Sequence, residues 1–197
     1  MPEHLEANLS LGSLYSKLGN KDEALIFYNR VLTLSPKHPS ATHMLHALTG
    51  VTTEGAPNQF VENLFDAYSV KYEEHLVKNL KYAVPAKMSE LIRQLGNKRF
   101  NKVIDLGCGT GLCAKEILDL SDCIIGVDLS RKMVEEAKKK DIYQKLFTGN
   151  IIEFLSHSTE QYNLALAADV FIYLGNLEKI AELLAQRLLF DGLLIFS

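Results

Sequence analysis

Tryptophan is absent from this 197-residue sequence, and cysteine, with three residues, and proline, with five, are scarce. The cysteines at 108, 113 and 123 cannot all pair with one another and match no zinc-binding spacing, so we expect free thiols in a reducing, cytoplasmic compartment. Five prolines and twelve glycines are too few for a fibrous or disordered chain. No apolar run approaches the roughly 18 residues of a membrane span, and the N-terminus does not resemble a signal peptide, so we expect no membrane association.

Neither sign of charge dominates, because 21 basic and 24 acidic residues leave a net charge of −3. The longest basic run, Lys138–Lys140, is most simply the solvated end of a helix, so we expect no nucleic-acid partner. The six histidines are scattered without metal-ligand spacing, and no metal site is expected. With 47% hydrophobic residues, the chain is long enough for one large globular domain or two small ones.

Residues 5–34 show the apolar spacing of two amphipathic helices, interrupted at Gly19-Asn20 and ended by Ser35-Pro36. This helical hairpin resembles a tetratricopeptide repeat, although Asn8 stands where the repeat's signature tryptophan would be. The signature positions that carry the resemblance are Leu11, Gly12, Tyr15, Ala24, Tyr28 and Pro36. An unrelated helical hairpin is the alternative interpretation.

A second repeat starts after Pro36 and stops at Gly50, so we expect one repeat and a capping helix over residues 1–50. A single repeat buries its faces poorly and must pack on the rest of the chain, on a second copy or on a partner protein. Residues 51–58 have the composition of a linker. Residues 59–100 form a predicted helical lead-in, within a second domain that covers residues 59–197.

Residues 101–197 alternate between predicted strands and helices, which favours an α/β fold with a Rossmann-like parallel sheet of about five strands. Ligands of such sheets bind beyond the carboxyl ends of the strands. Near its end the chain has a predicted helix over 177–189, a turn at Asp191-Gly192 and a last strand over 193–196. The other predicted strands are 102–106, 123–128, 143–148 and 163–169.

The first of these strands leads into Asp105-Leu-Gly-Cys-Gly-Thr-Gly111, in which alternate glycines let the backbone turn sharply and approach a ligand. A dinucleotide motif, G-x-G-x-x-G, would need glycine at position 112, where Leu112 stands. Asp128 ends the next strand 19 residues after Gly109, and a carboxylate there can accept both hydroxyls of a ribose. Nicotinamide cofactors and S-adenosylmethionine share that requirement, so Asp128 alone does not choose between them.

The G-x-G-x-G form with a preceding acid, followed by Asp128-Leu-Ser130, resembles class I S-adenosylmethionine-dependent methyltransferases. Residues 65–68, 72–76 and Pro85 are similar to the lead-in of a subgroup of predicted methyltransferases that also carry tetratricopeptide repeats. The resemblance implies that Asp105 and Gly107 hold the methionine amino group and that Asn150 takes the place of an adenine-binding aspartate. The residues expected to bind the cofactor are Asp105, Gly107, Cys108, Gly109, Gly111, Asp128, Leu129, Met133, Asn150, Ile151, Asp169 and Tyr72.

Several of these residues have a structural interpretation as well. Tyr68, Tyr72 and His75 are candidates for a lid over the cofactor, or ordinary core residues. Asp128 and Asp169 are ligand contacts or caps of turns, and Cys108 is most simply a filler of the loop. No general base can be assigned.

The resemblance implies a methyltransferase that acts on an unknown acceptor. A class I core normally continues beyond its fifth strand, so we expect residues 193–196 to lie at an open sheet edge that invites self-association. We therefore expect cofactor binding to be retained and the acceptor side to be damaged in this truncated core. The alternatives are a catalytically impaired module that works through its helical hairpin and, on weaker grounds, a nicotinamide-dependent reductase.

Overall fold

The computed structural model describes residues 3–51, 55–69, 72–96 and 99–197. The chain separates into two compact units, Met1–Phe60 and Val61–Ser197, which are described in turn. None of the helices among the described residues is long and apolar enough to cross a membrane.

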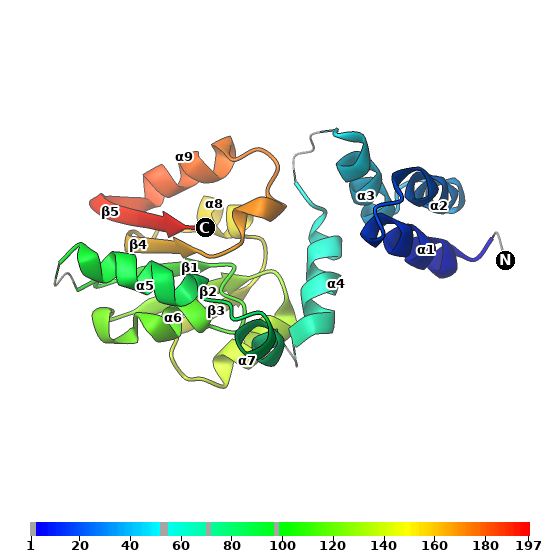
Figure 1. Ribbon diagram of the computed structural model, residues 1–197. Coiled ribbons are helices and arrows are strands. Elements are labelled where there is room, and N and C mark those ends of the chain that lie inside the picture. The colour runs from blue at the N-terminus through cyan, green and yellow to red at the C-terminus, as the bar shows by residue number, and fades with distance from the viewer. Residues whose placement is uncertain (1–2, 52–54, 70–71, 97–98) are drawn as a thin grey trace. The chain divides into compact units, whose positions relative to one another are not determined.

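The first unit contains three helices, α1 (Leu5–Lys17), α2 (Lys21–Leu34) and α3 (Pro39–Thr49) (Figure 1). Helices α1 and α2 form the predicted hairpin, in which Ala24 and Tyr28 are buried. A Cβ placed on Gly12 would lie 2.8 Å from Tyr28 Cε1, so only glycine lets α1 approach the tyrosine ring. The predicted hairpin is confirmed, and the small residue at position 12 is what brings its two helices together.

The second unit begins within α4 (Asn58–Tyr68), which is followed by a π-helical segment, Glu74–Asn79, and by α5 (Val84–Gln94). Pro85 lies in the first turn of α5, where its missing N–H costs no hydrogen bond. Residues 52–54 of the predicted linker lie outside the described residues.

The core of this unit is a five-stranded parallel sheet with the order β3-β2-β1-β4-β5, which confirms the predicted Rossmann-like α/β fold. The strands are β1 (Val103–Leu106), β2 (Ile124–Asp128), β3 (Lys145–Thr148), β4 (Tyr162–Ala167) and β5 (Leu188–Phe196). The helices between them are α6 (Leu112–Glu116), α7 (Arg131–Lys138), α8 (Ile151–His157) and α9 (Glu178–Arg187). The order reverses between β1 and β4, and the carboxyl end of β1 lies between those of β2 and β4.

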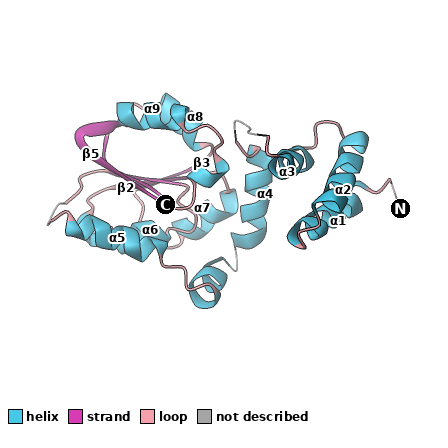
Figure 2. Cartoon of the chain, turned by 45° about the horizontal axis from the view of Figure 1, so that its top comes forward, coloured by secondary structure: helices cyan, strands magenta, loops and turns pink. Residues whose placement is uncertain are grey.

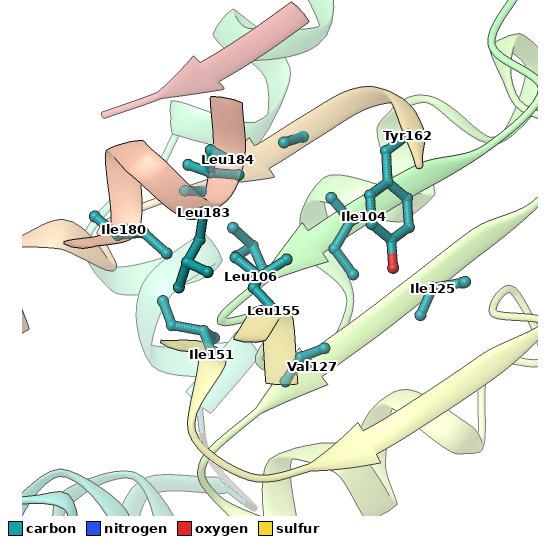
Figure 3. Close-up of a cluster of buried hydrophobic side chains, with 12 residues drawn as sticks. Ile104, Leu106, Ile125, Val127, Ile151, Leu155, Tyr162, Ile180, Leu183 and Leu184 are labelled. Carbon is teal, nitrogen blue, oxygen red and sulfur yellow. The ribbon is translucent and has the colours of Figure 1, made fainter. Parts of the chain in front are cut away.

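Alternate strand residues supply the two faces of the sheet. Ile104, Leu106 and Val127 pack against α8 and α9, in the cluster drawn in Figure 3. Val103 and Ile124 face the other way, toward α5 and α6. Figure 2 shows the strands between these two helical layers. Burial on both faces explains the near-continuous apolar strand sequences.

The predicted turn at Asp191-Gly192 is wrong, because these residues lie inside β5. Tyr162 pairs with Leu188 and Leu164 pairs with Leu193, so β5 contains extra residues that bulge from the ladder. A Cβ on Gly192 would lie 2.9 Å from the carbonyl oxygen of Leu189, which explains the glycine. The glycine therefore marks a bulge and not the reversal that an Asp-Gly pair usually predicts.

Candidate functional site

The glycine loop follows β1 and consists of residues 107–111. Gly107, Gly109 and Gly111 all have positive φ, at 64°, 52° and 90°. A Cβ on Gly107 would come within 2.3 Å of Val170 Cγ2, and one on Gly111 within 3.0 Å of the Tyr143 ring. Over Gly109 the first neighbour is Tyr72 Cε1, at 3.9 Å. The loop therefore needs glycine for conformation and for space, as its sequence predicts.

Asp128 is the last residue of β2, and its carboxylate binds the glycine loop directly. Oδ2 accepts a hydrogen bond from the Gly109 N–H at 2.8 Å, and Oδ1 accepts one from the Ser130 N–H, also at 2.8 Å. Burial raises the pKa of Asp128 to about 6, against the lowering effect of these two donors. The capping role of Asp128 is thus observed, and its carboxylate lies where the carboxyl ends of β1 and β2 are adjacent.

Asp105, in β1, is the second buried carboxylate of the site, only 1% exposed. The Tyr143 hydroxyl donates a hydrogen bond to Asp105 Oδ2 at 2.7 Å. The pKa of Asp105 is raised to about 7, chiefly by burial; the Tyr143 hydrogen bond lowers it, and the Asp128 carboxylate makes a smaller upward contribution. Two acidic side chains are therefore held close together in a poorly solvated place.

The helical lead-in is attached to the sheet at the ends of α7. Asp66 accepts a hydrogen bond from the Ser130 hydroxyl at 2.5 Å and a longer one, 3.4 Å, from the Lys132 N–H. Glu73 forms an ion pair with Lys140. The prediction that Lys138–Lys140 is simply a solvated helix end is therefore wrong for Lys140, whose partner is 67 residues away in the sequence.

Aromatic residues of the lead-in lie over the glycine loop. The Tyr72 ring meets Phe65 edge-on at 6.2 Å between centroids, and Phe65 meets Tyr173 at 5.5 Å. Burial, with Asp128 as the next cause, raises the pKa of Tyr72 to about 12, so its hydroxyl stays protonated. His75 is half-buried in the π-helical segment, and the Tyr68 side chain lies outside the described residues.

Asp169 follows β4 and has a positive φ of 52°, which is unusual for a residue with a side chain. Its carboxylate accepts hydrogen bonds from the Tyr82 hydroxyl at 2.6 Å and the Ser197 hydroxyl at 3.0 Å. Its own N–H donates to Ser197 Oγ at 2.9 Å. These contacts stabilise a strained backbone, in keeping with the capping interpretation.

The remaining predicted residues are mainly structural in their side chains. Asn150 caps α8, since its Oδ1 accepts from the Ile152 and Glu153 N–H groups at 2.8 and 3.3 Å. Met133 and Ile151 are buried in the core, as is Cys108 in the loop, and Leu129 is half-buried. At these core positions the backbone is the part that can reach a ligand.

Sequence patterns did not reveal Tyr143 or Tyr82 as members of the site. Their partners are 38 and 87 residues away, and no local motif surrounds either tyrosine.

Within the described ranges, no group of three or more metal-ligating side chains is present. A cavity of about 470 Å³ lies along β3 and α8, and its lining includes Asn150 but not the glycine loop.

Comparison with known proteins gives two family matches, one in each unit of the chain. Residues 103–191 match the family described as "Methyltransferase domain", and residues 5–38 match the tetratricopeptide repeat. A malonyl-[acyl-carrier protein] O-methyltransferase of Bacillus anthracis is 26% identical over 140 residues, which cover 70% of this chain and 51% of the relative. The chain thus spans about half the length of the curated relatives it matches.

Solved structures share the fold. A putative S-adenosyl-L-methionine-dependent methyltransferase of Methanococcus maripaludis superposes with a TM-score of 0.56 at 17% identity, covering 68% of this chain and 64% of the other. The DhpI–SAH complex gives a TM-score of 0.55 at 20% identity, with 71% and 67% covered. Residues 103–191 therefore match the methyltransferase-domain family, residues 5–38 match the tetratricopeptide repeat, and the second unit shares the class I methyltransferase fold of these solved structures.

Proposed function

We propose that this chain binds S-adenosylmethionine and transfers its methyl group to an acceptor. The observation that carries the proposal is the hydrogen bond from the Gly109 N–H to Asp128, which joins the glycine loop and the end of β2 in one corner of the sheet edge. The family match of residues 103–191 supports the same activity. The alternative is a catalytically impaired module that binds the cofactor but transfers no methyl group. None of the contacts described above favours this alternative over turnover.

The residues of the corner fit this cofactor. S-adenosylmethionine carries an ammonium and a sulfonium group, and the corner presents Asp105 and Asp128, two buried carboxylates without a cationic partner among the bonds described above. A cationic ligand would offset the cost of burying them. The glycine loop supplies the close backbone approach that a side chain would block.

In this proposal Asp105 and the Gly107 backbone hold the methionine ammonium. Asp128 accepts the ribose hydroxyls, because an ionised carboxylate has about four acceptor positions and the N–H groups of Gly109 and Ser130 use two. Asn150 and Ile151 border the adenine at the carboxyl end of β3, although Asn150 Oδ1 also caps α8. The backbones of Cys108, Gly109, Gly111, Leu129 and Met133 complete the cradle.

Tyr72 is the proposed lid residue, since its ring lies 3.9 Å from the Cβ position of Gly109. An aromatic face near a sulfonium group is stabilising through cation–π attraction. The cofactor supplies an electrophilic methyl group for in-line displacement by the acceptor. The chain contributes alignment and exclusion of water, and Asp169 with Tyr82 borders the end of β4, where we place the acceptor.

Two further proposals concern context. Buried Cys108 and Cys113 are free thiols, which supports a reducing, cytoplasmic location. The exposed leucines of the repeat, including Leu14 and Leu18, support a protein partner or a second copy at the helical hairpin.

The test is isothermal titration of the full chain with S-adenosylmethionine and with NADH, followed by transfer of a labelled methyl group to a panel of carboxylate, hydroxyl and amine acceptors. We expect micromolar binding of S-adenosylmethionine, none of NADH, and labelling of one acceptor class. Absence of binding at millimolar S-adenosylmethionine contradicts cofactor use. Binding without labelling of any acceptor favours the non-catalytic alternative.

A further inference from the structure

We propose that Tyr143 is a positioning residue for the cofactor, because its hydroxyl fixes the Asp105 carboxylate in the orientation that receives the ammonium group. The proposal rests on the function proposed above. It adds a side chain that lies outside the glycine motif and outside the segment that follows Asp128.

The contact is short and well placed. Tyr143 Oη donates to Asp105 Oδ2 at 2.7 Å, so one carboxylate oxygen has a fixed donor and the plane of the group is set. Oδ1 is then the oxygen that remains for an ammonium group. Asp105 lies in a fully buried strand, where an unpartnered carboxylate would be costly and free to rotate away from the loop.

The tyrosine ring itself is held firmly. Cβ atoms on Gly111 and Gly126 would lie 3.0 and 2.8 Å from its Cε2 and Cε1, so the ring fills space that these two glycines leave. The next residue, Gln144, makes two hydrogen bonds to Ile124. Its side-chain Oε1 accepts from the Ile124 N–H at 2.5 Å, and its backbone N–H donates to the Ile124 carbonyl oxygen at 3.0 Å. The hydroxyl is therefore presented to Asp105 from a rigid support.

The surrounding charges explain why this donor matters. The titratable groups that face Asp105 are Asp128, Tyr143, Cys108 and Cys113. Burial and the Asp128 carboxylate raise the pKa of Asp105 to about 7, and the tyrosine opposes both. Without the hydroxyl, a smaller fraction of Asp105 would be ionised at neutral pH, and the cofactor's ammonium would lose its partner.

The decisive variant is Tyr143→Phe, which keeps the ring and removes the donor. In the ligand-free protein, a ¹³C NMR titration of the Asp105 carboxyl should give a pKa roughly one unit higher than in the wild type. Calorimetry with S-adenosylhomocysteine at pH 7 should show affinity reduced about tenfold, in the range of a hydrogen bond to a charged group. The difference should shrink by pH 9, where Asp105 is ionised in both proteins.

Two further variants separate positioning from general damage. Tyr162→Phe removes another buried tyrosine hydroxyl from the opposite face of the sheet and should change neither the Asp105 titration nor the affinity. In an Asp105→Asn background, which lacks the titrating carboxylate, adding Tyr143→Phe should cause at most a twofold further loss. A tenfold loss in that background would assign the effect to packing and overturn the proposal.

The outcomes distinguish this proposal from the function on which it rests. Wild-type protein that fails to bind S-adenosylhomocysteine contradicts both. Wild-type binding that Tyr143→Phe leaves unchanged at every pH, with an unchanged Asp105 titration, contradicts the role of Tyr143 alone.

Discussion

The Asp128 carboxylate and the main-chain N–H of Gly109, 19 residues apart in the sequence, lie within hydrogen-bond distance at 2.8 Å. Because Asp128 ends β2 and Gly109 is central to the loop after β1, this contact fixes the loop against the neighbouring strand. A second N–H, from Ser130, holds the other carboxylate oxygen and starts α7. One side chain thus organises three backbone segments around the proposed cofactor site.

Substituting Gly107 by alanine should destabilise the second unit strongly. The residue has a φ of 64°, and the new Cβ would clash with Val170 at 2.3 Å. We expect a loss of about 2–4 kcal/mol from backbone strain and overpacking together, measured by urea unfolding. Gly96→Ala is the matched control, since Gly96 also has a positive φ, of 97°, but no atom within 4 Å of its Cβ position. That variant should lose only about 1 kcal/mol, and equal losses would show that the contact with Val170 is unimportant.

Cofactor affinity should weaken as the solution becomes acidic. The pKa values of Asp105 and Asp128 are raised to about 7 and about 6, so both side chains gain protons as the pH falls from 8 to 5.5. Neutral carboxyl groups no longer attract a cationic ligand, and the dissociation constant should increase at least tenfold over this range. Calorimetry at half-unit intervals of pH would measure it. A flat profile would remove both carboxylates from the binding site.

In the ligand-free protein, the same raised pKa values make the fold more stable at acidic pH, which is opposite to their effect on cofactor affinity. A carboxyl group with a higher pKa when folded than when unfolded binds protons preferentially in the folded state, so its contribution to stability falls as pH rises from about 4 through 7. Asp105→Asn should therefore flatten this part of the profile of unfolding free energy against pH, relative to the wild type.

Removing the Asp66 carboxylate should loosen the lead-in over the glycine loop. Asp66→Ala deletes the hydrogen bonds to Ser130 and Lys132. Hydrogen exchange of amides in residues 61–69 and 72–80 should accelerate, while the strands keep their protection. Glu182→Ala is the control, because its pairing with Lys179 is exposed and lies within α9, outside the lead-in. Unchanged exchange in Asp66→Ala would show that the lead-in does not depend on this contact.

In the first unit, Gly12→Ala should separate α1 from α2. The added Cβ would lie 2.8 Å from the Tyr28 ring, which is itself buried. We expect a loss of about 1–3 kcal/mol confined to the helical repeat. Circular dichroism during thermal unfolding should show an earlier helical transition, with the transition of the sheet unit unchanged. Gly19→Ala, at an open position with positive φ, provides the comparison.

The parts of the fold that follow local rules were predictable. Glycines at 107, 109 and 111 mark a loop of positive φ, and the apolar runs before Asp105 and Asp128 mark strands that are buried on both faces. Each feature depends on a few neighbouring residues. The hairpin was predictable for the same reason, because Gly12 and Tyr28 belong to a repeat with fixed spacing.

The contacts that complete the site were not predictable, because they join residues that are far apart in the sequence. Tyr143 meets Asp105, Tyr82 meets Asp169 and Asp66 meets Ser130 across separations of 38, 87 and 64 residues. The packing of the lead-in and of β3's preceding loop against the sheet brings these pairs together. The bulge in β5 was missed for a related reason, since Asp191-Gly192 predicts a turn locally and the pairing with β4 overrides it.

The central claim, that the cofactor binds at the joined ends of β1 and β2, is tested most directly by titrating S-adenosylhomocysteine into wild-type protein, Asp128→Ala and the exposed control Asp119→Ala. The variant Asp128→Ala lacks the carboxylate that bonds to Gly109 and Ser130 and, in the proposal, to the ribose. The account therefore predicts at least a hundredfold weaker binding for this variant. The control should match the wild type. Equal affinity in all three proteins would contradict the account.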